Sequence, residues 1–182
     1  MDCHSVDQDV HYLQGEASQL SDRPNSTSAL RPVAVALGSN IGDRVSHLKY
    51  AVARLGRLLV GLRASTFVET QPEGVVSQAA FLNAAVVGQS AEAPTELLTA
   101  LMMIERERAR IRPFPGAPRT LDLDLILVGN LVNLSPSLEL PHPRFRDRRF
   151  VLEPLFEIAP DLVDPVTGLT VTKLLVRLDL RT

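Results

Sequence analysis

The sequence predicts an α+β fold, and three observations lead to this prediction. Several apolar stretches have the length of a strand and end at glycine or other turn-forming residues. Two longer segments between them place apolar side chains at helical spacing. The elements follow one another as strand, helix, strand, strand, helix, strand, which is typical of the split βαβ arrangement. We therefore expect a ferredoxin-like βαββαβ sandwich, with an additional C-terminal hairpin and short helices.

The first half of the predicted sandwich starts with a strand over Val33 to Leu37 that ends at Gly38. Asn40 and Gly42 favour a tight turn after it. The segment "DRVSHLKYAVARLG" then predicts a helix with Asp43 as N-cap and Gly56 past its end. Its apolar face comprises Val45, Leu48, Val52 and Leu55.

The second half begins with two predicted strands, "LRASTFVET" and "AFLNAAVVG", joined by the loop "QPEGVVSQA". Pro94 then stands near the first turn of a second helix with a basic C-terminal end. The face of this helix comprises Leu97, Leu101, Ile104 and Arg108. "LDLDLILV" is the fourth strand. A hairpin in "GNLVNLSPSLEL", a helix in "RRFVLEPLFEIA" and a last helix near Val171 to Leu178 complete the chain.

Length and composition narrow the class of protein. A chain of 182 residues with 45% hydrophobic side chains can bury one core, but it is too short for two ordinary domains. Residues 1–32 are polar without periodicity and predict a flexible extension, so the globular domain is expected at 33–182. Without an apolar run of about 18 residues or a signal-peptide pattern, we expect a cytoplasmic protein with no membrane partner. The net charge of -2 gives no indication of a nucleic-acid partner.

Two aspartates interrupt the fourth predicted strand. Because side chains alternate along a strand, Asp122 and Asp124 lie on one face and the leucines between and beside them on the other. Adjacent carboxylates are unfavourable unless a cation or hydrogen-bond donors offset them. Magnesium favours one or two carboxylates, with water and substrate phosphates as its other ligands. An edge strand with one wet face would give the same D-x-D pattern, so the pattern alone leaves both readings open.

Arginines gather around these two aspartates in the sequence. Arg119 lies three residues before Asp122, and Arg110 and Arg112 lie upstream, across the loop "PFPGAP". The planar guanidinium suits phosphate oxygens. The acidic pair and the arginines together indicate phosphoryl chemistry, in which charge neutralisation supplies most of the catalysis. The sequence has no G-x-x-x-x-G-K-[ST] loop, so this site would not be a P-loop.

Several separated segments together resemble one family, the 6-hydroxymethyl-7,8-dihydropterin pyrophosphokinases of folate biosynthesis. The matching segments lie between about Val33 and Leu162 and read "ALGSNIGDR", "ETQPEG", "QAAFLNAAVV", "IERERARIR", "APRTLDLDLI" and "LPHPRFRDRRFVLEPLFEIAPDL". The resemblance implies a ferredoxin-like pyrophosphokinase domain. It also implies transfer of diphosphate from ATP to the hydroxymethyl group of 6-hydroxymethyl-7,8-dihydropterin, with release of AMP and with two Mg²⁺ ions. On this basis we expect a monomer that acts on these two small molecules.

The resemblance also assigns roles to individual residues. Asp122 and Asp124 resemble the metal-binding carboxylates. Thr70 and Asn83 match hydrogen-bonding contacts to the pterin, and Phe81 and Phe150 match rings that stack on its two faces. Glu105 is similar to an acidic residue that supports the nucleotide site by ordering nearby arginines. The residues expected to bind ATP and its phosphates are Arg110, Arg112, Arg119, Arg148 and His142. Arg110, Arg112 and Arg119 join the aspartates as expected catalytic residues.

The chain departs from the family pattern around two loops. Ala109 stands where a glycine is usual and is expected to resist a positive φ. The loop "PFPGAP" lacks the usual arginine and tryptophan, for which Arg108 or Arg146 could substitute. Gln71 and Glu73 stand in the pterin loop, where other members often have apolar residues.

Two alternatives to this function remain open. A ferredoxin-like module could bind a nucleotide or a pterin without catalysis, because a fold does not decide a function. The residues Gln71 and Glu73 are also compatible with a pyrophosphokinase that acts on a different heteroaromatic alcohol. The sequence indicates no clear general base.

Overall fold

The computed structural model describes residues 29–71, 78–110 and 117–181. Most of the predicted N-terminal extension, residues 1–32, lies outside these ranges. Among the described residues, none of the helices is long and apolar enough to cross a membrane.

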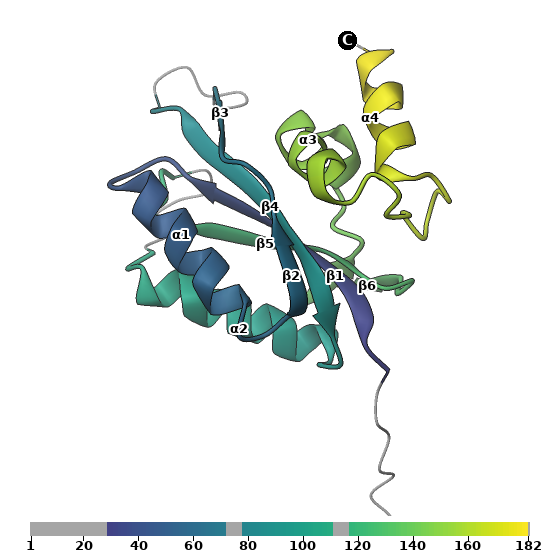
Figure 1. Ribbon diagram of the computed structural model, residues 1–182, viewed down its shortest axis with the longest axis horizontal. Helices are drawn as coiled ribbons and strands as arrows, with labels where there is room; N and C mark the ends of the chain where they lie inside the picture. Colours follow the sequence, from purple (N-terminus) through teal and green to yellow (C-terminus); the bar gives the residue numbers. More distant parts are fainter. Residues whose placement is uncertain (1–28, 72–77, 111–116, 182) are drawn as a thin grey trace, which may run out of the picture.

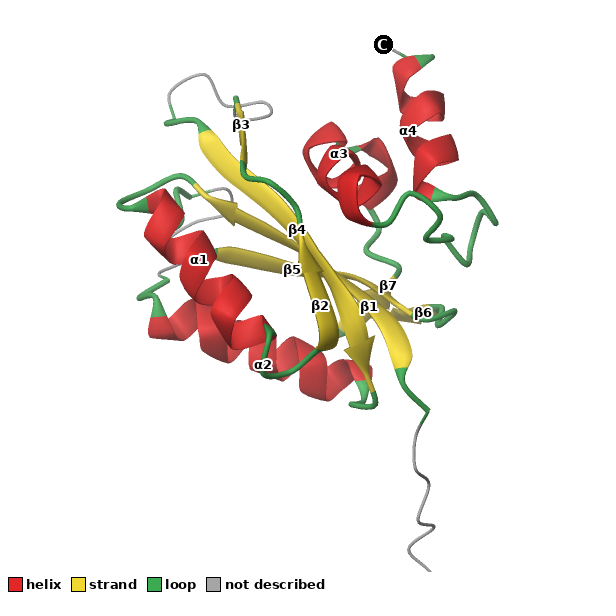
Figure 2. Cartoon of the chain, in the orientation of Figure 1, coloured by secondary structure: helices red, strands yellow, loops and turns green. Residues whose placement is uncertain are grey.

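An antiparallel sheet forms the centre of the molecule (Figure 2). Its main strands are β1 (Arg31–Ser39), β2 (Val60–Ala64), β4 (Phe81–Ser90) and β5 (Asp122–Val128). They lie in the order β2-β4-β1-β5, and the short strand β3 (Val68–Thr70) also pairs with β4. β1 and β4 are therefore central, and β5 lies at an edge. This arrangement confirms a mixed α and β fold with an antiparallel sheet.

Helices cover both faces of this sheet (Figure 1). α1 (Arg44–Leu55) and α2 (Pro94–Glu107) lie on one face, and α3 (Arg149–Ile158) and α4 (Val171–Asp179) on the other. The alternation along β1 divides the core accordingly. Val33, Val35 and Leu37 pack in the cluster with α1 and α2, whereas Ala34 and Ala36 pack in the cluster with α3 and α4. Small residues on the second face leave room for α3 to approach.

The predicted helix signals are mostly confirmed. The Asp43 side chain accepts a hydrogen bond from the N–H of Ser46, and Gly56 is the C-cap residue of α1. Pro94 is the first residue of α2. The predicted apolar face of α1 was wrong at one position, because Val45 is exposed. Leu48, Ala51 and Leu55 bury the inner face instead, at spacings of three and four residues.

The predicted single strand "LRASTFVET" was also wrong, since β2 and β3 are separated by residues 65–67. Ser65 still pairs with Ala85, but its hydroxyl accepts the N–H of Ala85 at 2.9 Å in place of a backbone carbonyl. The next residue turns to α3, where the N–H and hydroxyl of Thr66 donate to the Glu157 carboxylate at 2.7–3.1 Å. The contact with α3 thus interrupts the strand.

The C-terminal elements agree with the sequence prediction. A hairpin joins β6 (Asn133–Ser135) to β7 (Leu138–Leu140), a 3₁₀ turn covers Phe145–Asp147, and α3 and α4 follow. The connection between α3 and α4 is held by Asp164, whose side chain is fully buried. The guanidinium of Arg146 donates to it at 2.7 and 2.8 Å, and Thr167 and the N–H of Val166 donate as well.

We expect Asp164→Ala to destabilise the fold by about 2–3 kcal/mol, because it removes a buried charge-assisted network and leaves Arg146 without its partner. Chemical denaturation measures the difference. Arg181→Ala is the control, since its ion pair with Asp147 is exposed and should contribute less than about 0.5 kcal/mol. An equally small loss of unfolding free energy in both variants would show that the Asp164 network does not stabilise the fold.

The same network predicts a dependence of stability on pH. Burial opposes ionisation of Asp164, but the hydrogen bonds from Arg146, Thr167 and Val166 outweigh it and lower the pKa of this carboxyl. The stabilisation is therefore complete above the ordinary aspartate pKa, and it is lost as pH falls through the lower pKa of the folded state.

Ala109 contradicts the expectation that it would resist a positive φ, because its φ is 53°. This left-handed conformation is unfavourable for a residue with a Cβ atom, by about 1–2 kcal/mol. The turn after α2 therefore keeps the backbone that a glycine would adopt more easily.

Replacing Ala109 by glycine should stabilise the protein by about 1 kcal/mol and raise Tm by about 2–4 °C, because the strain exceeds the added entropy of the unfolded chain. Ala53→Gly, on the exposed face of α1, is a matched control that should lower Tm. A lower Tm for the Ala109 variant in thermal unfolding would show that its left-handed backbone carries no strain.

Candidate active site

The candidate site lies on the face of the sheet that α3 covers, where β1 ends and where β4 and β5 begin. Gly38 of β1 pairs with Asn83 on one side and with Asp122 on the other. A Cβ atom on Gly38 would lie 3.2 Å from Asn83 Oδ1 and 3.8 Å from Phe81 and Asp122. The glycine therefore leaves space among three of the predicted site residues, which the sheet brings together.

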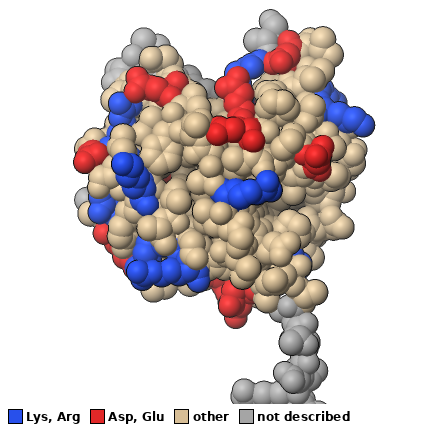
Figure 3. Space-filling model, viewed as in Figure 1, with Lys and Arg blue, Asp and Glu red and all other residues tan. Residues whose placement is uncertain are grey.

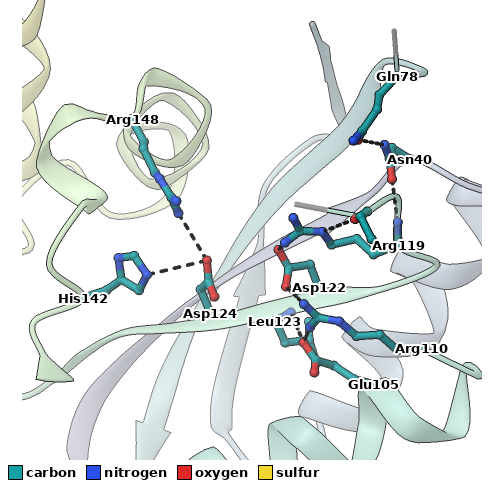
Figure 4. A network of polar contacts seen from close by, with 11 residues as sticks. Asn40, Gln78, Glu105, Arg110, Arg119, Asp122, Leu123, Asp124, His142 and Arg148 are labelled. Atoms are coloured by element: carbon teal, nitrogen blue, oxygen red, sulfur yellow. Dashed lines mark hydrogen bonds and ion pairs between the residues drawn. The ribbon is translucent and has the colours of Figure 1, made fainter. Parts of the chain in front are cut away.

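Asp122 is fully engaged by arginines (Figure 4). Nη2 of Arg110 lies 2.6 Å from Asp122 Oδ1, and Nη1 of Arg119 forms a short ion pair with Oδ2. Asp124 has weaker partners, with Arg148 Nη1 at 3.4 Å and His142 Nε2 at 3.8 Å from its Oδ2. The Asp122 and Asp124 side chains are 19% and 34% exposed. Asp124 is thus the carboxylate that is more open to an incoming ligand.

Glu105 anchors one of these arginines from α2. Its buried carboxylate forms an ion pair with Arg110 and accepts the N–H of Leu123 at 2.8 Å. Leu123 lies in the edge strand β5, between the two aspartates. One carboxylate therefore fixes both the strand that carries the acidic pair and an arginine that neutralises it (Figure 4).

Three of the four predicted pterin residues lie on the β3–β4 hairpin, and Phe150 lies on α3. Asn83 is buried, and its Nδ2 donates to Thr70 Oγ1 at 2.7 Å. Phe81 and Phe150 are half-buried and so are not ordinary core residues. Each has a site arginine over its ring, with Arg119 5.8 Å from the Phe81 centroid and Arg148 5.4 Å from that of Phe150. The ring residues and the acidic pair are thus joined through shared arginines.

The surroundings of His142 lower its pKa. Burial is the largest cause, Asp124 acts in the opposite direction, and Arg148 and Arg144 lower the pKa further. The N–H of Arg144 donates to Nδ1 at 3.3 Å, so the ring proton lies on Nε2, toward Asp124. A neutral N–H donor beside a carboxylate suits a phosphate or nucleotide oxygen.

Two residues that support the site were not predicted, Asn40 in the turn after β1 and Arg44 at the start of α1. Asn40 is buried, and its Nδ2 donates to Gln78 Oε1 at 3.2 Å and to the Ala79 carbonyl at 3.4 Å. Its Oδ1 accepts the N–H of Arg119 at 2.8 Å. Arg44, the first residue of α1, contacts both ends of the same loop, through the Ala80 carbonyl and the Glu69 carboxylate. An asparagine directly after a buried strand is the sequence signal that could have indicated the contacts of Asn40, because a buried amide needs hydrogen-bond partners.

Some predicted residues lie elsewhere. Arg112 and Glu73 fall outside the described residues. Arg108 points to α1, where its Nε donates to His47 Nδ1 at 2.8 Å and its guanidinium covers Tyr50. Burial and Arg108 lower the pKa of His47, which keeps this acceptor neutral. Arg146 is likewise committed to Asp164. Both arginines thus have other partners in this structure, and their suggested role in place of the missing contacts stays a prediction.

The acidic pair fits magnesium better than a metal held by protein ligands alone. Within the described ranges, no group of three or more His, Cys, Asp or Glu side chains could hold a metal ion. Two carboxylates on one strand face, with arginines beside them, match an ion whose remaining ligands are water and phosphate. The site therefore offers only a minority of the ligands that magnesium needs, and a phosphorylated ligand and water would supply the rest.

The surrounding surface carries both signs of charge. Figure 3 shows lysine and arginine side chains interspersed with acidic ones over the face in view. Within the site, Arg110, Arg119 and Arg148 are likewise paired with the carboxylates of Glu105, Asp122 and Asp124.

Comparisons with known proteins agree with this geometry. A family model for 7,8-dihydro-6-hydroxymethylpterin-pyrophosphokinase (HPPK) matches residues 34–160. The 2-amino-4-hydroxy-6-hydroxymethyldihydropteridine pyrophosphokinase of Synechocystis sp. is 40% identical over 148 residues, 80% of this chain and 75% of that protein. The protein of the same name from Bacillus subtilis is 41% identical over 136 residues, 74% of this chain and 81% of its own length.

Other relatives are much longer than this chain. The folic acid synthesis protein fol1 of Pneumocystis carinii is 39% identical over 140 residues, 76% of this chain but 19% of that protein. A crystal structure of Plasmodium falciparum HPPK-DHPS has a TM-score of 0.64 at 14% identity, covering 82% of this chain and 45% of its own. The chain thus spans a fifth to a half of these longer proteins, and the second likeness shows the fold alone. With the family model and the bacterial relatives, these findings show that the chain belongs to the 7,8-dihydro-6-hydroxymethylpterin-pyrophosphokinase (HPPK) family.

Proposed function

We propose that this chain transfers diphosphate from ATP to the hydroxymethyl group of 6-hydroxymethyl-7,8-dihydropterin and releases AMP, as a step of folate biosynthesis. The observation that carries the proposal is the acidic pair Asp122 and Asp124, with arginines on both sides and Phe81 next to it on the same sheet face. The names of the bacterial relatives support the same reaction.

We propose in addition that the sandwich is ferredoxin-like. If β2 and β3 are the two halves of one strand, the sheet order β2-β4-β1-β5 is that of a split βαβ unit. α1 and α2 on one face agree with this arrangement, and α3 and α4 would be additions on the other (Figure 1). The proposed catalytic domain runs from β1 to α4.

The pterin side of the site would bind a flat heteroaromatic ring. Phe81 and Phe150 each offer a ring face, and Asn83 and Thr70 offer polar atoms at the edge. Arg119 and Arg148 lie over the two rings without a ligand, so a pterin that stacks there would replace guanidinium contacts by ring contacts.

The phosphate side would bind ATP through positive charge. We propose that Asp122 and Asp124 hold two Mg²⁺ ions, which supply Lewis-acid stabilisation of the phosphoryl oxygens when bound. Arg110, Arg119 and Arg148 already lie beside the carboxylates, and they would orient the phosphates and offset the charge on the leaving AMP. Arg112 would join them, and the neutral His142 would donate to the nucleotide.

Phosphorus NMR of the protein with ATP, Mg²⁺ and 6-hydroxymethyl-7,8-dihydropterin tests this function. AMP and a pterin diphosphate should appear, and Asp122→Asn with Asp124→Asn should slow their formation by about a hundredfold or more, because the metal-binding charge is lost. Asp147→Asn removes an exposed carboxylate and is the matched control.

Intact ATP in the wild type, while pterin still binds, would contradict catalysis and favour a pterin-binding module. Turnover with another heteroaromatic alcohol, but none with this pterin, would instead move the proposal to a different substrate. Full activity of the double aspartate variant would remove the metal assignment.

A further inference from the structure

Arg44 joins the two ends of the loop between β3 and β4. Its Nη1 donates to the carbonyl of Ala80 at 2.7 Å, and its Nη2 donates to Glu69 Oε2 at 2.9 Å. Glu69 lies in β3, and Ala80 immediately precedes β4. One guanidinium on the rigid end of α1 therefore contacts the chain on both sides of residues 71–79.

The residues that Arg44 contacts are direct neighbours of two proposed pterin residues. Thr70 follows Glu69, Phe81 follows Ala80, and Thr70 and Phe81 are register partners in the β3–β4 ladder. Because side chains alternate along a strand, Glu69 and Thr70 point to opposite faces. Arg44 thus contacts the hairpin on the face opposite the pocket, one residue away from the groups that would touch the ligand.

β3 depends on such external contacts. It is three residues long and pairs only with β4 among the described strands. A short edge strand has few ladder hydrogen bonds to fix its position. Glu157 of α3 binds Thr66, which lies shortly before β3, and Arg44 binds Glu69 near the C-terminal end of β3. The hairpin is therefore fixed from both sides of the sheet.

The pair Arg44–Glu69 contributes little to global stability. The two side chains are 31% and 56% exposed, and exposed ion pairs are weak. The bond to the Ala80 carbonyl is part-buried and charge-assisted, so it is the stronger of the two. A planar fork can serve both acceptors at once, which a lysine ammonium cannot do in the same geometry.

We infer that Arg44 is a positioning residue for the pterin, which keeps the short strand β3, and with it Thr70, in place beside Phe81 without touching the substrate. The inference rests on the proposed function and adds a determinant of pterin affinity outside the pocket. We expect ATP binding to depend little on Arg44, because Asn40 separately pairs with the backbone of Arg119 on the phosphate side.

Steady-state kinetics of Arg44→Met test this inference. We expect KM for the pterin to rise about tenfold, while KM for ATP stays within about twofold, since a charge-assisted hydrogen bond is lost on the pterin side alone. Glu69→Gln keeps an acceptor and the Ala80 contact, and it should raise KM for the pterin only about twofold. Equilibrium binding of the pterin, followed by its fluorescence, should show the same ratios.

Arg54→Met is the matched control, because Arg54 also lies on α1 and forms an ion pair with Glu107 at 3.0 Å, with side chains 34% and 32% exposed. It should leave both KM values unchanged. Circular dichroism and Tm of all variants separate a local effect from misfolding. Arg44→Lys keeps one of the two contacts, so its KM for the pterin should lie between those of the wild type and of Arg44→Met.

An active wild type whose Arg44→Met variant binds the pterin normally would overturn this inference and leave the proposed function intact. Equal rises in both KM values would also overturn it, because they would indicate a general structural role. Absence of AMP formation in the wild type would instead remove the proposed function, and this inference with it.

Discussion

The arrangement of the site depends on one constraint, the repulsion between two carboxylates on the same face of one strand. Asp122 and Asp124 are separated by one residue in β5, so their charges must be offset locally. Three arginines from different segments do this: Arg110 after α2, Arg119 before β5 and Arg148 before α3. The parts of the chain that would bind phosphate are therefore already assembled around the acidic pair.

The alternation of the sheet strands allows a polar site to share strands with an apolar core. Leu123 and Leu125 of β5 pack with α1 and α2, while the aspartates on the same strand face the other layer. β4 repeats this division, with Leu82 and Ala84 in the core and Phe81 and Asn83 toward the site. Because Phe81, Asn83 and the two aspartates lie on paired strands, backbone hydrogen bonds rather than loops set the spacing of these four side chains.

Local patterns predicted most of the elements and the acidic pair, whereas contacts between distant residues decided the rest. Alternation and capping placed α1, α2 and β5 correctly because these signals act within a few residues. The break between β2 and β3 depends on Glu157, 91 residues from Thr66. Arg108 resembled a phosphate ligand in sequence, but His47 and Tyr50 across the helix pair hold it. The roles of Asn40 and Arg44 likewise arise from contacts with distant loops.

Arginines occupy the carboxylates in the free protein, and we propose that a metal binds there together with nucleotide phosphates. Calorimetric titration of Mg²⁺, with and without a non-hydrolysable ATP analogue, tests it most directly. We expect Mg²⁺ binding to be weak without the analogue, since Arg110 and Arg119 already engage both oxygens of Asp122. Binding should tighten at least about tenfold when phosphates supply further ligands. Equally tight binding of Mg²⁺ without nucleotide would contradict the account.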